Sequence, residues 1–301
     1  MTVAHVAPTA HRDPPTDPAI RQHTCPVFTC TVTMASHGPP TVPFAEAERR
    51  LRALDRRYSR FRADSELSRL NAAAGRWHDV SGDLRAMLEH ALAVAAASTD
   101  LVNAAVLPRL LAAGYVRSWA EGVPDAVPAP PVAPVPPLAS VLELRGRTAR
   151  LAPGYGIDVG ALAKGRWADD VVTWLGPNSA AGIGGDVACR GAGPDGDGWP
   201  VALPDGEVLL VRDGGVATSG TARRRWGADG HHLIDPRTGV PATSDVVRAT
   251  VLAETGACAD WVASALVIGG SPAADRLTGR RDVHQVWLSR SPREPERGAA
   301  R

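Results

Sequence analysis

The sequence has no excess of charge of one sign. Lysine and arginine total 33 against 32 for aspartate and glutamate, so the net charge is +1. This balance gives no general attraction to nucleic acid or to an anionic membrane, although local basic patches stay possible. Cysteine is also scarce, and its spacing matches neither a zinc site nor a disulfide framework. We interpret the 4 cysteines as ordinary small apolar residues: Cys25, Cys30, Cys189 and Cys258.

Long apolar runs are missing as well. The first two dozen residues carry prolines and charges without the continuous apolar core of a secretory signal, and no later run reaches membrane-spanning length. We therefore expect a cytoplasmic protein without membrane insertion. Residues 1–23 are expected to form a disordered tail, because they offer little apolar surface to offset the entropy of ordering. Residues 291–301 are expected to form a loose, charged tail.

Apolar residues are nevertheless abundant enough for a buried core, since 44% of the 301 residues are hydrophobic. The first part of the chain predicts a half-buried strand over 27–34 and then mostly helices. The expected helix starts are Pro43, with an apolar core stripe that runs to Phe61, then Asp64 or Ser65, then Ser81, then residue 104.

The proline-rich stretch over 123–137 predicts an exposed, extended insertion, because proline lacks the backbone donor that helices and central strands need. From residue 141 onward short strands and turns predominate, interrupted by helices over 161–175 and 256–270. Helices and strands are mixed without strict alternation. This order favours a single α+β domain over residues 24–290 rather than a doubly wound parallel sheet.

The stretch "GIGGDV", Gly182 to Val187, allows two interpretations. Glycine serves any strained backbone, so the motif can be only a tight bend after a strand. It can also let the backbone approach a phosphate or a flavin ring. Because it lacks the spacing of a dinucleotide-binding fingerprint or a P-loop, it indicates neither by itself.

"DVGALAKG" places Asp158 and Lys164 around the start of a helix. Free backbone N–H groups and the helix dipole favour an anion there, and Lys164 adds a full positive charge. The alternative is a solvated lysine on an exposed helix face, which is the commoner situation.

"ACADWVASAL" places Asp260 and Ser264 four residues apart, on one face of a helix. A carboxylate and a hydroxyl oxygen suit a hard cation such as Mg²⁺, with water and phosphate oxygens completing its shell. Taken alone, a buried polar pair that hydrogen-bonds within the protein is the more frequent outcome.

"HHLIDPRTGVP" combines two histidines with a turn sequence. Asp235-Pro236 starts a turn readily, so the corner needs no catalytic explanation. In an extended segment His231 and His232 point to opposite faces, so at most one of them enters a given site.

Taken together and in order, these segments resemble the FAD:protein FMN transferase (ApbE) family from about Leu54 to Gly270. The similar pieces are "LDRRYSRFRADSELSRLN", "DVGALAKG", "GIGGD", "VATSG", "HHLIDPRTG" and "ADWVASAL". The resemblance implies a T-fold-related α+β domain. It also implies an activity, Mg²⁺-assisted transfer of FMN from FAD to a threonine of an acceptor protein with release of AMP.

The resemblance further implies roles for particular residues. Asp260 and Ser264, with the backbone carbonyl of Ala161, are expected to hold the metal. His232 is the imidazole of the family's His-x-Ile-Asp-Pro motif, and a base titrating near neutrality suits the attacking hydroxyl. The residues expected at FAD are Phe61, Leu101, Val102, Asn103, Asp158, Lys164, Gly184, Gly185, Asp186 and Ile234. Backbone donors around Gly184 and Gly185 are expected to help neutralise the diphosphate.

Three departures from the family pattern stand out. Ser264 replaces a threonine, Asn103 replaces an aspartate, and the stretch around Cys25-Pro26-Val27 replaces a Met-Gly-Thr signature. Two other activities stay open, an Mg²⁺-dependent FAD pyrophosphatase and a non-catalytic flavin-binding module. A domain in which every motif is only a turn or a cap is the remaining alternative.

Overall fold

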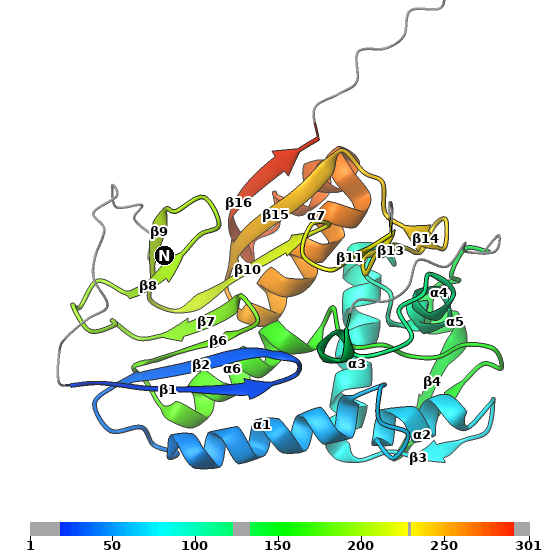
Figure 1. Cartoon of the computed structure of the whole chain (residues 1–301), viewed down its shortest axis with the longest axis horizontal. Helices are drawn as coiled ribbons and strands as arrows, with labels where there is room; N and C mark the ends of the chain where they lie inside the picture. The colour runs from blue at the N-terminus through cyan, green and yellow to red at the C-terminus, as the bar shows by residue number, and fades with distance from the viewer. Residues whose placement is uncertain (1–18, 123–132, 228–229, 292–301) are drawn as a thin grey trace, which may run out of the picture.

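The computed structural model describes residues 19–122, 133–227 and 230–291 of the chain. Its centre is a seven-stranded sheet in the order β1-β2-β6-β7-β10-β15-β16, in which every neighbouring pair is antiparallel (Figure 1). The strands are β1 (Ile20–Val27), β2 (Cys30–His37), β6 (Ser179–Ile183), β7 (Asp186–Arg190), β10 (Gly214–Gly220), β15 (Val246–Ala253) and β16 (Val283–Arg290). The expected α+β class is confirmed.

Two helices, α6 (Ala163–Leu175) and α7 (Gly256–Leu277), pack against one face of this sheet and against each other. They cross closely at Gly165, where a side chain would collide with the carbonyl of Gly256. The carboxylate of Asp169 accepts hydrogen bonds of 2.8 Å from the N–H groups of Gly256 and Ala257. It thereby fixes the start of α7 on α6.

The opposite face of the sheet carries a second, smaller apolar cluster. The hairpin of β8 (Trp199–Ala202) and β9 (Val208–Val211) covers Cys189, Val216 and Leu252 there. Because side chains alternate along a strand, their neighbours Ala188, Ala217 and Val251 belong to the main core instead.

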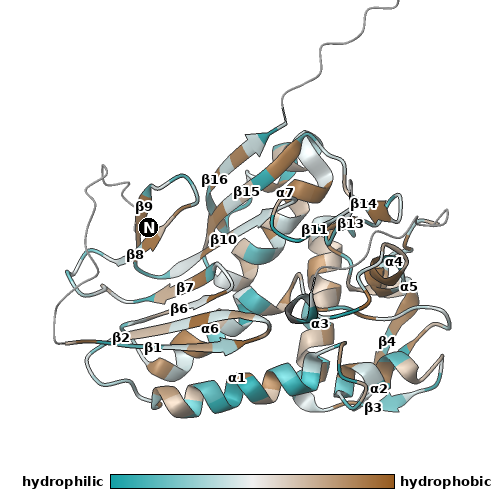
Figure 2. Cartoon of the chain, viewed as in Figure 1, coloured by the Kyte–Doolittle hydropathy of each residue, from teal (hydrophilic) through white to brown (hydrophobic). Residues whose placement is uncertain are grey.

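Most of the remaining helices and short strands lie at one end of the sheet, while α1 runs alongside β1 and α6 toward that end (Figure 1). Figure 2 shows that the first of them, α1, is largely hydrophilic, in agreement with its few buried residues, Ala47, Leu51 and Tyr58. These elements are α1 (Phe44–Tyr58), α2 (Glu66–Ala72), α3 (Gly82–Ser98), η1 (Ala104–Val106), α4 (Leu107–Ala112), η2 (Trp119–Glu121), α5 (Leu138–Val141), β3 (His78–Asp79), β4 (Leu142–Arg145), β5 (Thr148–Leu151), β11 (Arg225–Trp226), β12 (Gly230–His231), β13 (Ile234–Asp235) and β14 (Val240–Pro241).

The N-terminal expectations were partly wrong. The predicted strand over 27–34 spans a hairpin turn, at which Phe28 and Thr29 have φ of 55° and 58°. Alternation of apolar and polar residues continues through the turn, so the pattern does not reveal the break. Residues 20–23 belong to β1 rather than to a disordered tail, whereas residues 1–18 lie outside the described part, as do residues 292–301.

Other expected boundaries also shift. Ser65 and Ser81 cap α2 and α3 as expected, accepting from the N–H groups of Ser68 at 2.9 Å and Leu84 at 3.1 Å. The helix expected over 104–113 is divided into η1 and α4. Residues 123–132 of the proline-rich stretch lie outside the described residues.

Within that stretch, Val135 is buried rather than exposed. Its N–H donates to the carbonyl of Pro236 at 2.7 Å, which ties the end of the stretch to the "DPRTG" turn. The expectation of an exposed insertion is therefore wrong at this position.

Helix α7 is long and apolar enough to cross a membrane by length and composition, which the sequence interpretation did not anticipate. However, 83% of its most apolar window is buried inside the protein, so it is a core helix. It breaks at Gly270, where φ is 64° and ψ is −155°, just before Pro272. The carbonyls freed near the break accept from Ser244 and Arg237.

Candidate functional site

A cavity of about 600 Å³ opens where the loop after α1, the loop before α6, the end of β10 and one face of α7 meet. Every residue that the sequence predicted for the site lines this cavity except Gly185. The lining residues from that set are Phe61, Leu101, Val102, Asn103, Asp158, Ala161, Lys164, Gly184, Asp186, His232, Ile234, Asp260 and Ser264. Segments far apart in sequence therefore converge on one space.

Four of these side chains form what we call the lysine cluster: Lys164, Asp186, Asp260 and Ser264. The Lys164 ammonium forms an ion pair with Asp186 and lies 3.6 Å from Oδ1 of Asp260. The other carboxylate oxygen of Asp260 accepts a 3.1 Å hydrogen bond from the N–H of Gly165. Helix α6 thus supplies both the cation and a backbone donor to a carboxylate on α7.

Electrostatics in the lysine cluster are dominated by burial and by the three charges themselves. Burial raises the pKa of Asp260 to about 7, against the opposing effect of Lys164, and Asp186 raises it further. Burial alone would lower the pKa of Lys164, but Asp186 and Asp260 more than offset this effect and raise it. Lys164 therefore stays protonated as a fixed positive charge. A second cation beside Asp260 would favour the ionised form of its carboxylate.

Lys164 is the only lysine in the sequence, so arginine makes up the rest of the Lys plus Arg total of 33. A compact ammonium presents a point charge that fits between two carboxylates, whereas a guanidinium is a planar fork. A chain that otherwise uses arginine throughout keeps its single lysine beside the carboxylates of Asp186 and Asp260. The single lysine is therefore a signal, visible in the composition alone, that points to this site.

The donor set fits a hard divalent cation. Asp260 and Ser264, one turn apart on α7, are each 2% exposed and both line the cavity beside Ala161. Carboxylate, hydroxyl and carbonyl oxygens are the ligands that Mg²⁺ accepts. The hydroxyl of Ser264 also lies 2.9 Å from that of Ser219 on β10, so "VATSG" contributes to the site by orienting Ser264.

Asp158 does not present a free carboxylate to the cavity, contrary to the role implied for it. Its Oδ1 accepts a 2.7 Å hydrogen bond from the N–H of Gly160. Its Oδ2 lies 2.6 Å from Nε of Arg60. Arg60 also lies over two rings, with Cζ 4.1 Å from the centroid of Phe61 and 4.5 Å from that of Tyr115.

We call Arg60, Phe61, Tyr115 and Asp158 the arginine clamp. Phe61 was expected to continue the apolar core stripe of the preceding helix, but α1 ends at Tyr58 and Phe61 is 37% exposed. Sequence reasoning missed Arg60 and Tyr115, because nothing in their local sequence indicates that loops 55 residues apart meet. It also missed Arg223 and Arg224, which line the cavity beyond the end of β10.

The loop that carries Asp158 is held by Asn71, the last residue of "SELSRLN". The Asn71 side chain accepts from the N–H of Ile157 at 2.7 Å and donates to the carbonyl of Ile157 at 3.0 Å. One amide therefore satisfies both backbone groups of a buried residue. The two motifs quoted separately from the sequence are thus parts of one structural unit.

The polar atoms of Asn103 are used within the protein. Its Oδ1 accepts from the N–H of Ala105 at 2.9 Å, and its Nδ2 donates to Asp100 at 3.1 Å and to the carbonyl of Pro136 at 3.0 Å. An aspartate could not donate those last two bonds. Asn103 therefore builds the cavity wall, next to Leu101 and Val102, and offers no free polar group to FAD.

The glycine pair of "GIGGDV" is a hairpin turn between β6 and β7. Gly184 and Gly185 have φ of 63° and 108°, which suits a two-residue turn. The N–H of Gly184 donates to the carbonyl of Thr31 at 3.1 Å, and Gly185 does not line the cavity. The expectation that these N–H groups neutralise a diphosphate is not supported; the turn instead positions Asp186 beside Lys164.

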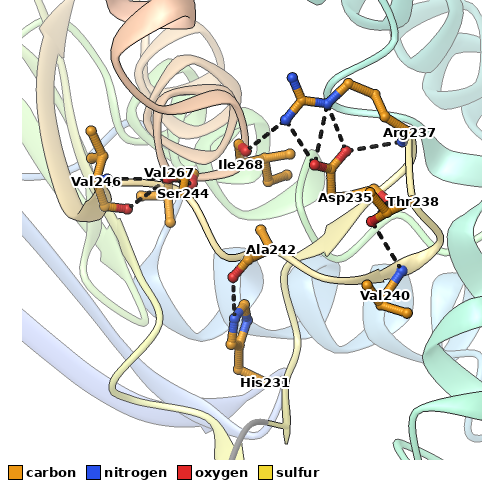
Figure 3. A network of polar contacts seen from close by, with 10 residues as sticks. All are labelled: His231, Asp235, Arg237, Thr238, Val240, Ala242, Ser244, Val246, Val267 and Ile268. Carbon is orange, nitrogen blue, oxygen red and sulfur yellow. Dashed lines mark hydrogen bonds and ion pairs between the residues drawn. The ribbon is translucent and has the colours of Figure 1, made fainter. Parts of the chain in front are cut away.

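The two histidines do point to different places. His231 lies away from the cavity, where its Nε2 is 2.9 Å from the carbonyl of Ala242 (Figure 3). The "DPRTG" corner is closed by Asp235, whose carboxylate pairs with Arg237 and accepts from the Arg237 N–H at 2.9 Å (Figure 3). Arg237 also donates to the carbonyl of Ile268, which joins the corner to α7.

His232 faces the cavity, and its Nδ1 is buried without a hydrogen-bond partner among the described residues. Burial lowers its pKa to about 3, and the positive charge of Arg224 adds to this effect. The premise that this imidazole titrates near neutrality is therefore wrong for the protein without ligand. His232 is a neutral imidazole at physiological pH.

An antiparallel α+β fold that encloses a carboxylate–lysine cluster and a neutral histidine in one cavity defines a ligand-binding protein with the groups for acid–base and metal chemistry. The sequence model of the ApbE family matches residues 28–287. The chain belongs to the ApbE family.

Curated relatives carry the name FAD:protein FMN transferase. That of Vibrio cholerae is 28% identical over 245 residues, which cover 75% of this chain and 72% of the relative. That of Treponema pallidum is 32% identical over 242 residues, 69% of this chain and 66% of the relative. That of Rhodobacter capsulatus is 32% identical over 292 residues, which cover 86% of this chain. They cover only 53% of the Rhodobacter capsulatus protein, so this chain spans about half of its length.

Solved structures show the same fold. A histidine-to-glycine variant of the flavin transferase ApbE from Vibrio cholerae superposes with a TM-score of 0.78 at 23% identity, covering 91% of this chain and 94% of that one. The apo flavinyl transferase ApbE from Pseudomonas stutzeri gives 0.77 at 23% identity, with 91% of each chain covered. At these identities the likeness establishes the fold.

Proposed function

We propose that this protein is an FAD:protein FMN transferase, which moves FMN from FAD to a threonine of an acceptor protein and releases AMP. The observation that carries the proposal is the lysine cluster, because it lies in the same cavity as His232. Family membership and the names of the relatives support the choice of FAD and of a protein acceptor.

Mg²⁺ is the proposed metal, and Asp260, Ser264 and the carbonyl of Ala161 are the groups that would hold it. When bound, it supplies Lewis-acid stabilisation of phosphate oxygen charge. Lys164 contributes a fixed positive charge beside the same oxygens. Asp186 keeps that ammonium in place, and Ser219 orients the hydroxyl of Ser264.

In the transfer step, the threonine Oγ forms a bond to the phosphorus of the FMN half, and the bond from that phosphorus to the AMP oxygen breaks. The hydroxyl proton goes to His232, which is neutral and has an unpartnered ring nitrogen. A diphosphate brings negative charge into the cavity, and this charge raises the pKa of His232 toward the range that a general base needs.

The direct test combines the purified protein, FAD, Mg²⁺ and an acceptor domain with a threonine target, followed by intact mass of the acceptor. The proposal predicts an added FMN on the acceptor and one AMP per FMN transferred. Rapid release of free FMN and AMP without acceptor would instead establish a pyrophosphatase. FAD binding with no product at any Mg²⁺ concentration would establish a flavin-binding module.

A further inference from the structure

Arg60 is a buried cation with unsatisfied donors on the wall of the cavity. Its side chain is 6% exposed, and its Nε lies 2.6 Å from Oδ2 of its ion-pair partner Asp158. Its terminal nitrogen Nη2 has no hydrogen-bond partner among the described residues. Nη2 carries two N–H donors, so this buried guanidinium keeps hydrogen-bonding capacity for a ligand.

The guanidinium is also held in one orientation. Asp158 fixes Nε, and the rings of Phe61 and Tyr115 lie 4.1 Å and 4.5 Å from Cζ. Asp158 is fixed in turn by the N–H of Gly160. A donor group that is oriented before the ligand arrives loses little entropy when it binds, which favours a recognition role.

The surroundings of Arg60 indicate the chemistry that it would recognise. Phe61 keeps 37% of its surface exposed and lines the same cavity. A flat heteroaromatic ring can lie on such a phenyl face while an acceptor atom at its edge meets the neighbouring guanidinium. A bare phosphate would use the charge of Arg60 but not the aromatic surface beside it.

The arginine clamp and the lysine cluster occupy different stretches of the cavity wall. Asp158, which fixes Arg60, lies in the loop between β5 and α6, and Lys164 lies six residues further on, within the first turn of α6. The ammonium is already the cation beside the carboxylates Asp186 and Asp260. When the diphosphate of a dinucleotide lies at Lys164, one of its ring systems can therefore lie at the arginine clamp.

We infer that Arg60 is a substrate-binding residue, which donates to an acceptor atom at the edge of a ring system of FAD stacked on Phe61, and that Asp158 is a positioning residue that acts through Arg60. This inference rests on the proposed function for the identity of the dinucleotide. It reassigns the contact that the sequence resemblance gave to Asp158. Both ring systems of FAD offer acceptor atoms, the flavin through its carbonyls and the adenine through its ring nitrogens.

The test measures affinities by calorimetry for FAD, riboflavin, adenosine and pyrophosphate in the wild type, Arg60→Gln and Arg60→Lys. Arg49→Gln is the control, since Arg49 lies outside the cavity on α1 with 76% of its side chain exposed. Loss of a charged hydrogen bond predicts FAD binding about 10-fold weaker or more in both Arg60 variants. The same loss is expected for riboflavin or for adenosine, whichever ring meets Arg60, and none for pyrophosphate.

Asp158→Asn distinguishes a positioning role of Asp158, exerted through Arg60, from a purely structural role. If Asp158 acts through Arg60, it weakens FAD binding less than Arg60→Gln does, and the double variant binds no more weakly than Arg60→Gln alone. Thermal melting checks folding, and Arg60→Lys, which keeps the charge facing Asp158, carries the test if Arg60→Gln is unfolded.

Three results would overturn the inference. In the first, both Arg60 variants bind FAD as tightly as Arg49→Gln does. In the second, only the affinity for pyrophosphate falls. In the third, the losses of FAD affinity from Asp158→Asn and Arg60→Gln add up in the double variant. A wild-type protein that binds no FAD would overturn the proposed function instead, so the two failures are distinguishable.

Discussion

The lysine cluster is built on helices and strands, whereas the arginine clamp is built on loops. Lys164 and Asp260 project from two helices that cross closely at Gly165, and Asp186 begins a strand. Arg60 and Phe61 follow α1, and Tyr115 and Asp158 lie in loops. The rigid elements fix charges whose positions determine the chemistry, while the loops provide a surface that selects what enters.

The largest effect is expected from Asp260→Asn. The amide keeps the shape but removes the charge that faces Lys164 and a bound cation, so FMN transfer should fall about 1000-fold or more. Acceptor flavinylation followed by flavin fluorescence measures it. Asp275→Asn, on the same helix but exposed, is the matched control and should keep wild-type activity.

His232→Ala is expected to slow transfer by about 100-fold or more, the usual contribution of a general base. FAD affinity should change little, because the variant removes a proton acceptor and not a charge. Equal rates for the wild type and the variant at saturating FAD would remove His232 from the reaction. Its neighbour His231 is unsuitable as a control for activity because it supports the "DPRTG" corner.

Lys164→Arg asks whether the only lysine is required for its shape or for its charge. A guanidinium keeps the charge but is a planar fork and not a compact point charge, so transfer should fall about 10- to 100-fold. An Lys164→Arg variant as active as the wild type would show that charge alone suffices there.

Asn71→Ala should act on both regions by releasing the loop that joins them. It leaves the N–H and carbonyl of Ile157 without partners, at a cost of about 1–3 kcal/mol of stability. We expect a lower melting temperature together with weaker FAD binding. A lower melting temperature with unchanged FAD affinity would show that the loop keeps its shape without Asn71.

The smallest effect concerns His90 on α3, outside the cavity. Burial lowers its pKa from 6.5 to about 4, and the positive charge of Arg166 adds to this effect. Between these pH values the unfolded chain binds a proton at His90 that the folded protein does not. The contribution of neutral His90 to the free energy of unfolding is therefore fully present above pH 6.5 and is lost as pH drops toward 4. His90→Gln should narrow the difference between the melting temperatures measured at about pH 7.5 and about pH 5. An unchanged gap would exclude His90 as its source.

How much the sequence predicts differs between the two regions for physical reasons. Asp260 and Ser264 are one helical turn apart, so their shared face follows from periodicity alone. The serine caps Ser65 and Ser81 likewise depend on local chemistry. Asp158 is only partly predictable. Its position before a helix follows from the sequence, but its ion pair with Arg60 does not.

The contacts of loop residues could not be predicted from the sequence, because the whole fold determines which side chains they meet. Arg60 meets Tyr115 and Asp158 only once three separate segments are packed, and no local pattern encodes that meeting. The hairpin turn at Phe28 and Thr29 was missed because both residues occupy the left-handed region that glycine normally takes. The depressed pKa of His232 likewise follows from burial, which only the assembled cavity determines.

The proposed chemistry depends on the carboxylate of Asp260 and the hydroxyl of Ser264 on α7 holding a divalent cation against the diphosphate of FAD. Calorimetric titration of FAD with and without Mg²⁺, in the wild type and in Asp260→Asn, tests it most directly. We expect Mg²⁺ to strengthen FAD binding to the wild type and to have no effect on FAD binding to the variant. An equal gain from Mg²⁺ in both proteins would contradict it.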